Sequence, residues 1–189
     1  AQALGERELA FARELGDQRL VAYSLLLLGF IALAREAYSD AQKLLGDSAA
    51  IYREVGQSAA LSWALAPLSA AALRLGNAHE AQQHLAEAMQ IAVETGSLTF
   101  LLPSLVAVAA FLAHQGERER AVEVYSLASS HPWVSNWAWL EDIAGRYVRA
   151  VASTLPPNVV QEATARGRAL DPWGTSAELL SQLTIPSSP

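Results

Sequence analysis

The chain of 189 residues contains no cysteine, a single lysine and no long uninterrupted apolar segment. Without cysteine it can form no disulfide, no thiolate nucleophile and no sulfur-rich zinc site. The longest apolar segments, residues 25–34 and 105–112, are shorter than the roughly 18 residues that a membrane-spanning helix needs. Nothing resembles a signal peptide either. We therefore expect no membrane association and a cytoplasmic location.

Charge is also scarce, and its balance is acidic. Charged residues make up 17% of the chain, and the formal net charge of -6 at pH 7 would repel the phosphates of a nucleic acid. Hydrophobic residues, many of them alanine and leucine, make up 52%, which favours helices around an ample core. The composition predicts one folded domain that does not bind nucleic acid directly.

Motifs for catalysis and nucleotide binding are missing as well. The chain has no G-x-x-x-x-G-K-[ST], G-x-G-x-x-G or G-x-S-x-G pattern. His79 and His84 are five residues apart, whereas a helical zinc pair needs a spacing of four. His84 with Glu80 or Glu87 could hold a metal, although a surface ion pair is the simpler interpretation. We expect a non-catalytic protein without a metal or cofactor.

Aromatic and charged residues near the C-terminus leave two interpretations open. Four of the five tryptophans lie here, namely Trp133, Trp137, Trp139 and Trp173. They could form an aromatic cage for a ligand or pack as buried side chains. The charged residues nearby are Glu141, Asp142, Arg146 and Arg149. These could line an enzyme pocket, or they could form a solvated face with one helical ion pair between Asp142 and Arg146.

What the chain does contain is a repeat of 40 residues. Four series of residues follow it: Ala1-Gln2, Ala41-Gln42, Ala81-Gln82 and Ala121; Gly16, Gly56 and Gly96; Glu36, Gly76 and Gly116; Leu28, Leu68 and Val108. A period of this length indicates one supersecondary unit copied along the chain, in which each copy buries its apolar face by stacking on its neighbours.

Each unit has the pattern of two helices. The apolar spacing predicts helix pairs at residues 17–34 and 40–55, 58–75 and 79–95, and 97–115 and 117–130. Gly56 can end its helix with a positive φ, and Asp17 and Ser97 are predicted N-caps. The repeats therefore occupy residues 17–56, 57–96 and 97–131, after a half repeat at residues 1–16.

Two prolines and the C-terminal region depart from this plan. Pro67 should remove the hydrogen bond to the carbonyl of Trp63 and kink its helix, whereas Pro103 is expected near a helix start, where the missing N–H is tolerated. The period is lost after Ser130. Helices predicted at residues 136–154, 159–170 and 176–183 are interpreted as a C-terminal cap spanning residues 132–185.

Small and apolar residues recur where two helices of a tetratricopeptide repeat approach closely. The second unit has Leu65, Leu68, Ser69, Ala72, Gly76, Ala81, Leu85 and Ala88, and the first has Leu25, Leu28, Gly29, Ala32, Ala41, Leu45 and Ser48. The chain resembles the tetratricopeptide superfamily in its longer variety of about 40 residues per unit. The resemblance implies an all-α, right-handed α-α superhelix of antiparallel helix pairs with a divergent cap.

Two weaker patterns are typical of one branch of this superfamily. The units end in E-x-G at Gly16, Gly56 and Gly96, and residues 166–170 read G-R-A-L after an arginine. Both resemble the sensor domains of bacterial signal-transduction ATPases and of MalT or LuxR-like transcriptional regulators. The chain would then be a fragment of such a regulator, coupled to upstream domains that carry the ATPase.

The resemblance also implies a binding groove, because tetratricopeptide arrays bind partners on the concave face formed by the first helices. Register places on this face Tyr23, Leu26, Phe30, Trp63, Ala66, Ala70, Pro103, Val106 and Ala110. They would form an apolar groove for a protein segment or a small inducer. Alternatively, they pack against the next helix or the cap.

The first fifteen residues suggest a different interaction. They correspond to a second helix whose first helix is absent, so Leu4, Leu9 and Phe11 should form an uncovered apolar flank. The sequence thus predicts a sensing or protein-interaction domain. The alternative is a structural module that self-associates, as a homodimer for example, through this edge and the groove.

Overall fold

The computed structural model describes residues 2–184 except residues 133, 135 and 136, and every regular element in this part is helical. The expected all-α class is confirmed. The repeat region consists of α1 (Gln2–Leu15), α2 (Gln18–Ala34), α3 (Tyr38–Glu54), α4 (Ser58–Arg74), α5 (Ala78–Thr95), α6 (Leu98–His114) and α7 (Arg118–Ser129). The predicted helix pairs match α2 to α7 within a few residues.

The helices of the repeat region end at intervals of twenty residues. The ends of α1 to α6 each have a residue in the left-handed region, at positions 16, 36, 56, 76, 96 and 116, and all of these except Glu36 are glycines. At all of these ends except that at Gly96, the next N–H donates to the carbonyl five residues earlier, as from Gln57 to Tyr52 and from Asn77 to Ala72, both at 2.9 Å. This pattern satisfies the last carbonyls of a helix and reverses the chain tightly.

The helix starts are less uniform than the ends. Asp17 caps α2 as predicted, since its side chain accepts hydrogen bonds from the N–H groups of Arg19 and Leu20 at 2.9 and 3.2 Å. Ser97 occupies the N-cap position of α6, but its side chain makes no capping bond. The sequence therefore identified both boundaries and only one of the two caps.

Both prolines lie inside continuous helices. α4 runs through Pro67 from Ser58 to Arg74, and the predicted bend there stays a prediction. Pro103 lies beyond the first turn of α6, since the first intrahelical bond already joins the N–H of Leu101 to the carbonyl of Ser97. The prediction that Pro103 lies where a missing N–H is tolerated is therefore wrong, because another residue at this position would donate to the carbonyl of Thr99.

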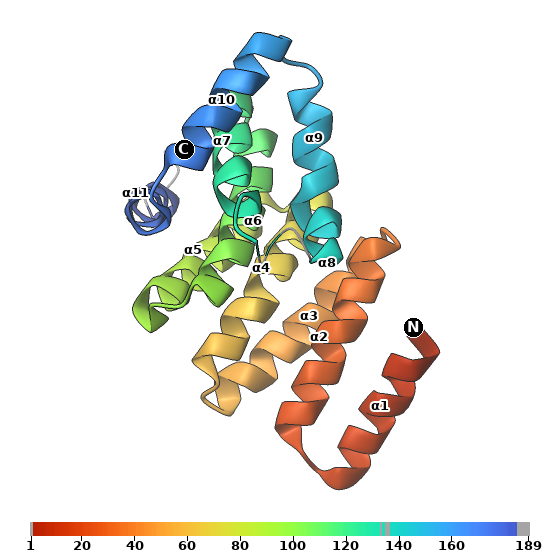
Figure 1. Cartoon of the computed structure of the whole chain (residues 1–189). Helices are drawn as coiled ribbons and strands as arrows, with labels where there is room; N and C mark the ends of the chain where they lie inside the picture. Colours follow the sequence, from red (N-terminus) through yellow and green to blue (C-terminus); the bar gives the residue numbers. More distant parts are fainter. Residues whose placement is uncertain (1, 133, 135–136, 185–189) are drawn as a thin grey trace.

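Consecutive helices pack side by side along the repeat region (Figure 1). A second set of contacts joins the first helices of successive units, from α2 to α4 and from α4 to α6. Leucines spaced by twenty residues, Leu45, Leu65, Leu85 and Leu105, lie in this core with at most 1% of their surface exposed. Each unit thus completes its core with side chains from its neighbours.

The remaining helices fold back on this array. A continuous helical run comprises α8 (Ala138–Leu140), the π-helical turn η2 (Glu141–Gly145) and α9 (Arg146–Ala152), and is followed by α10 (Pro157–Ala169) and α11 (Pro172–Thr184). η2 contacts α2, α4 and α6, whereas α10 packs on α7 and α11 packs on α5 (Figure 1). The C-terminal helices therefore cover both the first-helix face and the second helices of the array.

No described helix combines the length and the apolar character that crossing a bilayer requires.

Candidate functional site

The residues predicted to line the groove all lie on α2, α4 and α6, but most of them are inaccessible. Buried side chains comprise Leu26, Ala66, Ala70, Pro103, Val106 and Ala110. Phe30 and Trp63 are half-buried, and Tyr23 is 43% exposed. The structure brings Phe30 and Trp63 together and leaves Tyr23 apart, near Tyr52.

Phe30 and Trp63 belong to an aromatic cluster with three further rings. We define the aromatic cluster as Phe30, Trp63, Phe100, Trp137 and Trp139. The ring of Trp139 lies 4.5 Å from Phe30, 6.1 Å from Trp63 and 5.6 Å from Trp137, on which it stacks. Trp63 makes edge contacts with Phe100 and Trp137 at 6.2 and 5.6 Å. The first-helix face is thus occupied by two tryptophans of the C-terminal region.

One polar atom in this cluster is unsatisfied. The indole Nε1 of Trp63 is buried and has no hydrogen-bond partner among the described residues. A buried donor without an acceptor costs about 1–3 kcal/mol, so an acceptor brought by a ligand would be favoured here.

The other predicted tryptophans do not join this cluster. Trp173 lies in α11 and makes no ring contact with the described residues, and Trp133 lies outside the part that the structure describes. The cage hypothesis therefore reduces to Trp137 and Trp139 with rings from the repeat helices.

Two contacts near the aromatic cluster join the cap to the repeat region. The guanidinium of Arg74 on α4 lies 4.2 Å from the ring centre of Tyr147, a cation–π distance. Arg146 pairs with Glu36 at 3.7 Å across the turn between α2 and α3. The Arg146–Glu36 pair is exposed and Tyr147 is half-buried, and each contact contributes at most about 1 kcal/mol. The pairing predicted between Asp142 and Arg146 cannot be placed, because the Asp142 side chain lies outside the described part.

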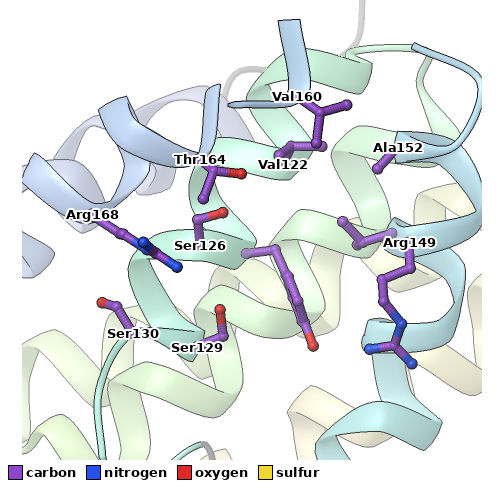
Figure 2. A pocket seen from close by; sticks show the side chains of 11 residues that line it. Val122, Ser126, Ser129, Ser130, Arg149, Ala152, Val160, Thr164 and Arg168 are labelled. Carbon is purple, nitrogen blue, oxygen red and sulfur yellow. The ribbon is translucent and has the colours of Figure 1, made fainter. Parts of the chain in front are cut away.

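A cavity of about 230 Å³ lies between α7, α9 and α10. Figure 2 shows Arg149 and Arg168 on opposite sides of it, with Ser126 and Ser129 between them. Tyr125, another lining residue, donates a hydrogen bond of 2.7 Å to Glu141, which also pairs with Arg149. Burial and the bond to Glu141 raise the pKa of Tyr125 to about 12.

Of the residues in the enzyme alternative, Arg149 lines this cavity, whereas Glu141 lies beside it as the partner of Tyr125 and Arg149. Its carboxylate lies against Gly145 in the π-helical turn, where a Cβ atom would overlap it. One oxygen accepts from Tyr125, and the other pairs with Arg149. This carboxylate links α7 to α9 through Tyr125 and Arg149, although the oxygen that faces Arg149 is buried and makes no well-formed hydrogen bond.

Metal binding finds no support in the described residues, which contain no cluster of three or more histidines and carboxylates suited to a metal. His84 lies 3.5 Å from Glu80, the spacing of a weak ion pair. The pair with Glu80 is only partly exposed, because the Nε2 atom of His84 is buried and has no hydrogen-bond partner among the described residues.

The N-terminal edge offers a different surface. Leu4, Phe11 and Leu15 on α1 are 69%, 59% and 57% exposed. Leu9, also predicted to be uncovered, is buried at 7% exposure against Val21, Leu25 and Leu28. That part of the prediction is wrong, because Leu9 lies on the side of α1 that meets α2. A cleft of about 480 Å³ opens beside it, between α1 and α3.

The G-R-A-L pattern has a structural role that sequence reasoning missed. Gly167 faces the backbone of α7, where a Cβ atom would overlap the carbonyl of Glu123. Arg166 reaches both Glu123 and Glu119. Burial alone would raise the pKa of Glu123, but hydrogen bonds from Arg166 and Arg120 hold it below its ordinary value. A glycine beside an arginine in a predicted helix was the available signal for this close approach.

Comparisons of the chain with protein-family models, with curated proteins and with solved structures found no match. In the part that the structure describes, the chain is an all-helical protein.

Proposed function

We propose that this chain is a non-catalytic tetratricopeptide-like domain that binds a protein segment or a small inducer on its first-helix face. Three features support the proposal: left-handed helix ends every twenty residues, contacts between successive first helices, and a core shared between neighbouring units. Together they favour antiparallel pairs stacked into a right-handed superhelix.

The observation that carries the functional part is the aromatic cluster. Trp137 and Trp139 of the cap rest on Phe30 and Trp63, two residues predicted to line the groove. The cap thus places aromatic rings on the first-helix face, and an external ligand would need similar aromatic groups to bind there. We infer that the ligand is an aromatic segment or aromatic small molecule with a hydrogen-bond acceptor for Trp63 Nε1.

The wider context of the proposal is a bacterial LuxR or MalT-like regulator or a signalling ATPase, acting in the cytoplasm. Displacement of the cap by a ligand would release α8 to α9, and this change would be passed to the other domains of such a protein. The E-x-G unit ends and the G-R-A-L pattern at residues 166–170 support this assignment through their resemblance to such regulators.

A peptide of the protein's own cap tests the proposal. Fluorescein-labelled residues 137–152 are titrated with the full chain, and anisotropy reports binding. The double variant Trp137→Ala and Trp139→Ala should bind this peptide roughly tenfold more tightly than the original chain, because its own segment no longer fills the cluster. Adding Trp63→Ala should remove the gain.

Trp173→Ala is the matched control, since this tryptophan makes no ring contact with the described residues. Circular dichroism verifies that each variant remains helical. Equal binding of the peptide by the original chain and the folded double variant would refute the first-helix face as a receptor.

A second candidate function is favoured by the exposed side of α1. Leu4, Phe11 and Leu15 form an uncovered apolar stripe, which a monomeric protein rarely leaves in water. This stripe supports a structural or oligomerisation role, and light scattering across concentrations separates the two functions.

A further inference from the structure

The exposed stripe of α1 lies on a side of the helix that is covered by neighbouring helices in the next repeat. Leu44 and Ile51 occupy the same positions 40 residues later as Leu4 and Phe11. Both are half-buried and pack against the cluster formed by α1 and α2, which contains Leu9. This side of a second helix is therefore an interface position in the repeat, and in α1 it lies open.

The stripe is a narrow band suited to one helix. Leu4, Phe11 and Leu15 are spaced by seven and four residues, which places them within a small arc of the helical surface. The side that meets α2 carries Gly5, Leu9 and Ala12 instead. An incoming helix would thus contact α1 without disturbing its packing on α2.

The charges beside the stripe indicate what the incoming helix is. Arg7 and Glu14 lie on the same edge of the stripe, seven residues apart, and neither has a charged partner among the described residues. A two-fold axis near residue 10, perpendicular to α1, would place Arg7 opposite Glu14 of a second copy. The same axis would place Leu4 on Leu15 of that copy and the two Phe11 rings side by side.

We propose that α1 is a self-complementary interface through which two copies of this chain form an antiparallel, two-fold dimer. The proposal rests on the second function above and specifies its partner and register. The Arg7–Glu14 and Leu4–Leu15 contacts each occur twice, and the two Phe11 rings meet at the axis, as a closed two-fold interface requires. Because only one helix per copy takes part, the dimer is weak, with a dissociation constant of roughly 10–100 µM.

Sedimentation velocity of the full chain between about 1 and 500 µM tests the proposal. The original chain should change from monomer to dimer over this range. Phe11→Glu should weaken the dimer at least about tenfold, because it places like charges at the axis. Arg7→Glu and Glu14→Arg should each weaken it roughly threefold to tenfold, since each aligns two charges of the same sign.

The double variant Arg7→Glu with Glu14→Arg is the decisive sample. It exchanges the two charges and should restore the dissociation constant to within about threefold of the original. The three substituted positions are all exposed, so circular dichroism should show unchanged helix content. A chain that stays monomeric at the highest concentration overturns the proposal, and so does a dimer that the double exchange does not restore.

The two proposals fail separately. Phe11→Glu leaves the aromatic cluster untouched, so peptide binding by a chain that also carries Trp137→Ala and Trp139→Ala should persist when the dimer is lost. Loss of both properties in Phe11→Glu would indicate that the variant had disturbed the fold, which circular dichroism detects.

Discussion

The two ends of the helical array are closed in different ways. At the C-terminal end, α10 packs on α7, α11 packs on α5, and the run from α8 to α9 lies against the first helices (Figure 1). At the N-terminal end, α1 packs principally on α2, and three large apolar side chains face outward. A stacked array buries its inner units through their neighbours, so its terminal surfaces need other solutions.

The comparison shows that a covered end depends on particular residues at the contact between the cap and the repeat region. Covering α7 requires a glycine at the point of closest approach, paired arginines and carboxylates, and a half-buried tyrosine bonded to a carboxylate. At the open end, Gly5 lies at the close approach of α1 to Leu28 of α2, but the outward face of α1 carries only a leucine and phenylalanine stripe. Substitutions should therefore have large effects at the closed end and small ones at the open end.

The largest effect is expected from Gly167→Ala. The new methyl group would overlap the carbonyl of Glu123, which belongs to the α7 backbone and cannot rotate away. α10 must then move off α7, and we expect the free energy of unfolding to fall by about 3 kcal/mol. Urea denaturation followed by circular dichroism measures the change.

Gly46→Ala is the matched control for this substitution. Gly46 lies inside α3, and no atom approaches within 4 Å of the place that an alanine methyl group would take. Alanine there should raise the free energy of unfolding by about 0.5–1 kcal/mol through its better helix propensity. If Gly167→Ala behaved in the same way, the close approach of α10 to α7 would be wrong.

The same contrast explains what the sequence could predict. Apolar periodicity located α2 to α7 because each of these helices repeats one pattern, with leucines such as Leu45 and Leu65 at fixed positions. The cap helices were also located, but their docking depends on contacts between distant residues, such as Gly167 with Glu123. Periodicity has no information about such contacts. The contact of Trp139 with the residues predicted to line the groove likewise depends on the path of the chain after Ser130, where the repeat ends. Periodicity therefore could not predict it.

The second-largest effect is a change in the free energy of unfolding with pH, caused by Tyr125 at the closed end. The folded pKa of Tyr125 is about 12, above the value of about 10 expected in the unfolded chain. Its contribution is therefore fully present below pH 10 and is lost as the pH rises towards 12, because the unfolded chain releases this proton first. Allowing for solvent screening, we expect a loss of about 1.5 kcal/mol.

Tyr125→Phe isolates this contribution. The variant cannot ionise at this position, so its stability should fall less steeply between pH 10 and pH 12 than that of the original chain. Urea denaturation at several pH values within the window measures the difference. Parallel pH profiles for the two proteins would contradict the assignment of the raised pKa to Tyr125.

A smaller effect of opposite sign is expected at Glu36. This is the one non-glycine residue with a positive φ in the described part, at 60°, and glycines occupy the corresponding positions 76 and 116. Glu36→Gly should stabilise the fold by about 1 kcal/mol, because the left-handed conformation strains a side chain. Loss of the exposed 3.7 Å pair with Arg146 offsets only a few tenths of a kcal/mol.

Glu36→Ala separates the two contributions, since it removes the pair and keeps the strain. It should leave stability unchanged or slightly lower, whereas Glu36→Gly raises the melting temperature. If both variants were less stable than the original chain by a similar amount, the pair with Arg146 would outweigh the strain.

The smallest effect is expected at the open end. Leu4→Ala and Phe11→Ala replace side chains that are 69% and 59% exposed, so each should change the free energy of unfolding by less than about 0.5 kcal/mol. Leu9→Ala, on the opposite side of the same helix, should cost about 2–3 kcal/mol, because Leu9 is only 7% exposed. The measurements belong at a few micromolar, below the expected dimer concentration, where self-association cannot contribute. Comparable losses for Leu4 and Leu9 would show that the outward face of α1 is already covered, and the contrast between the two ends would disappear.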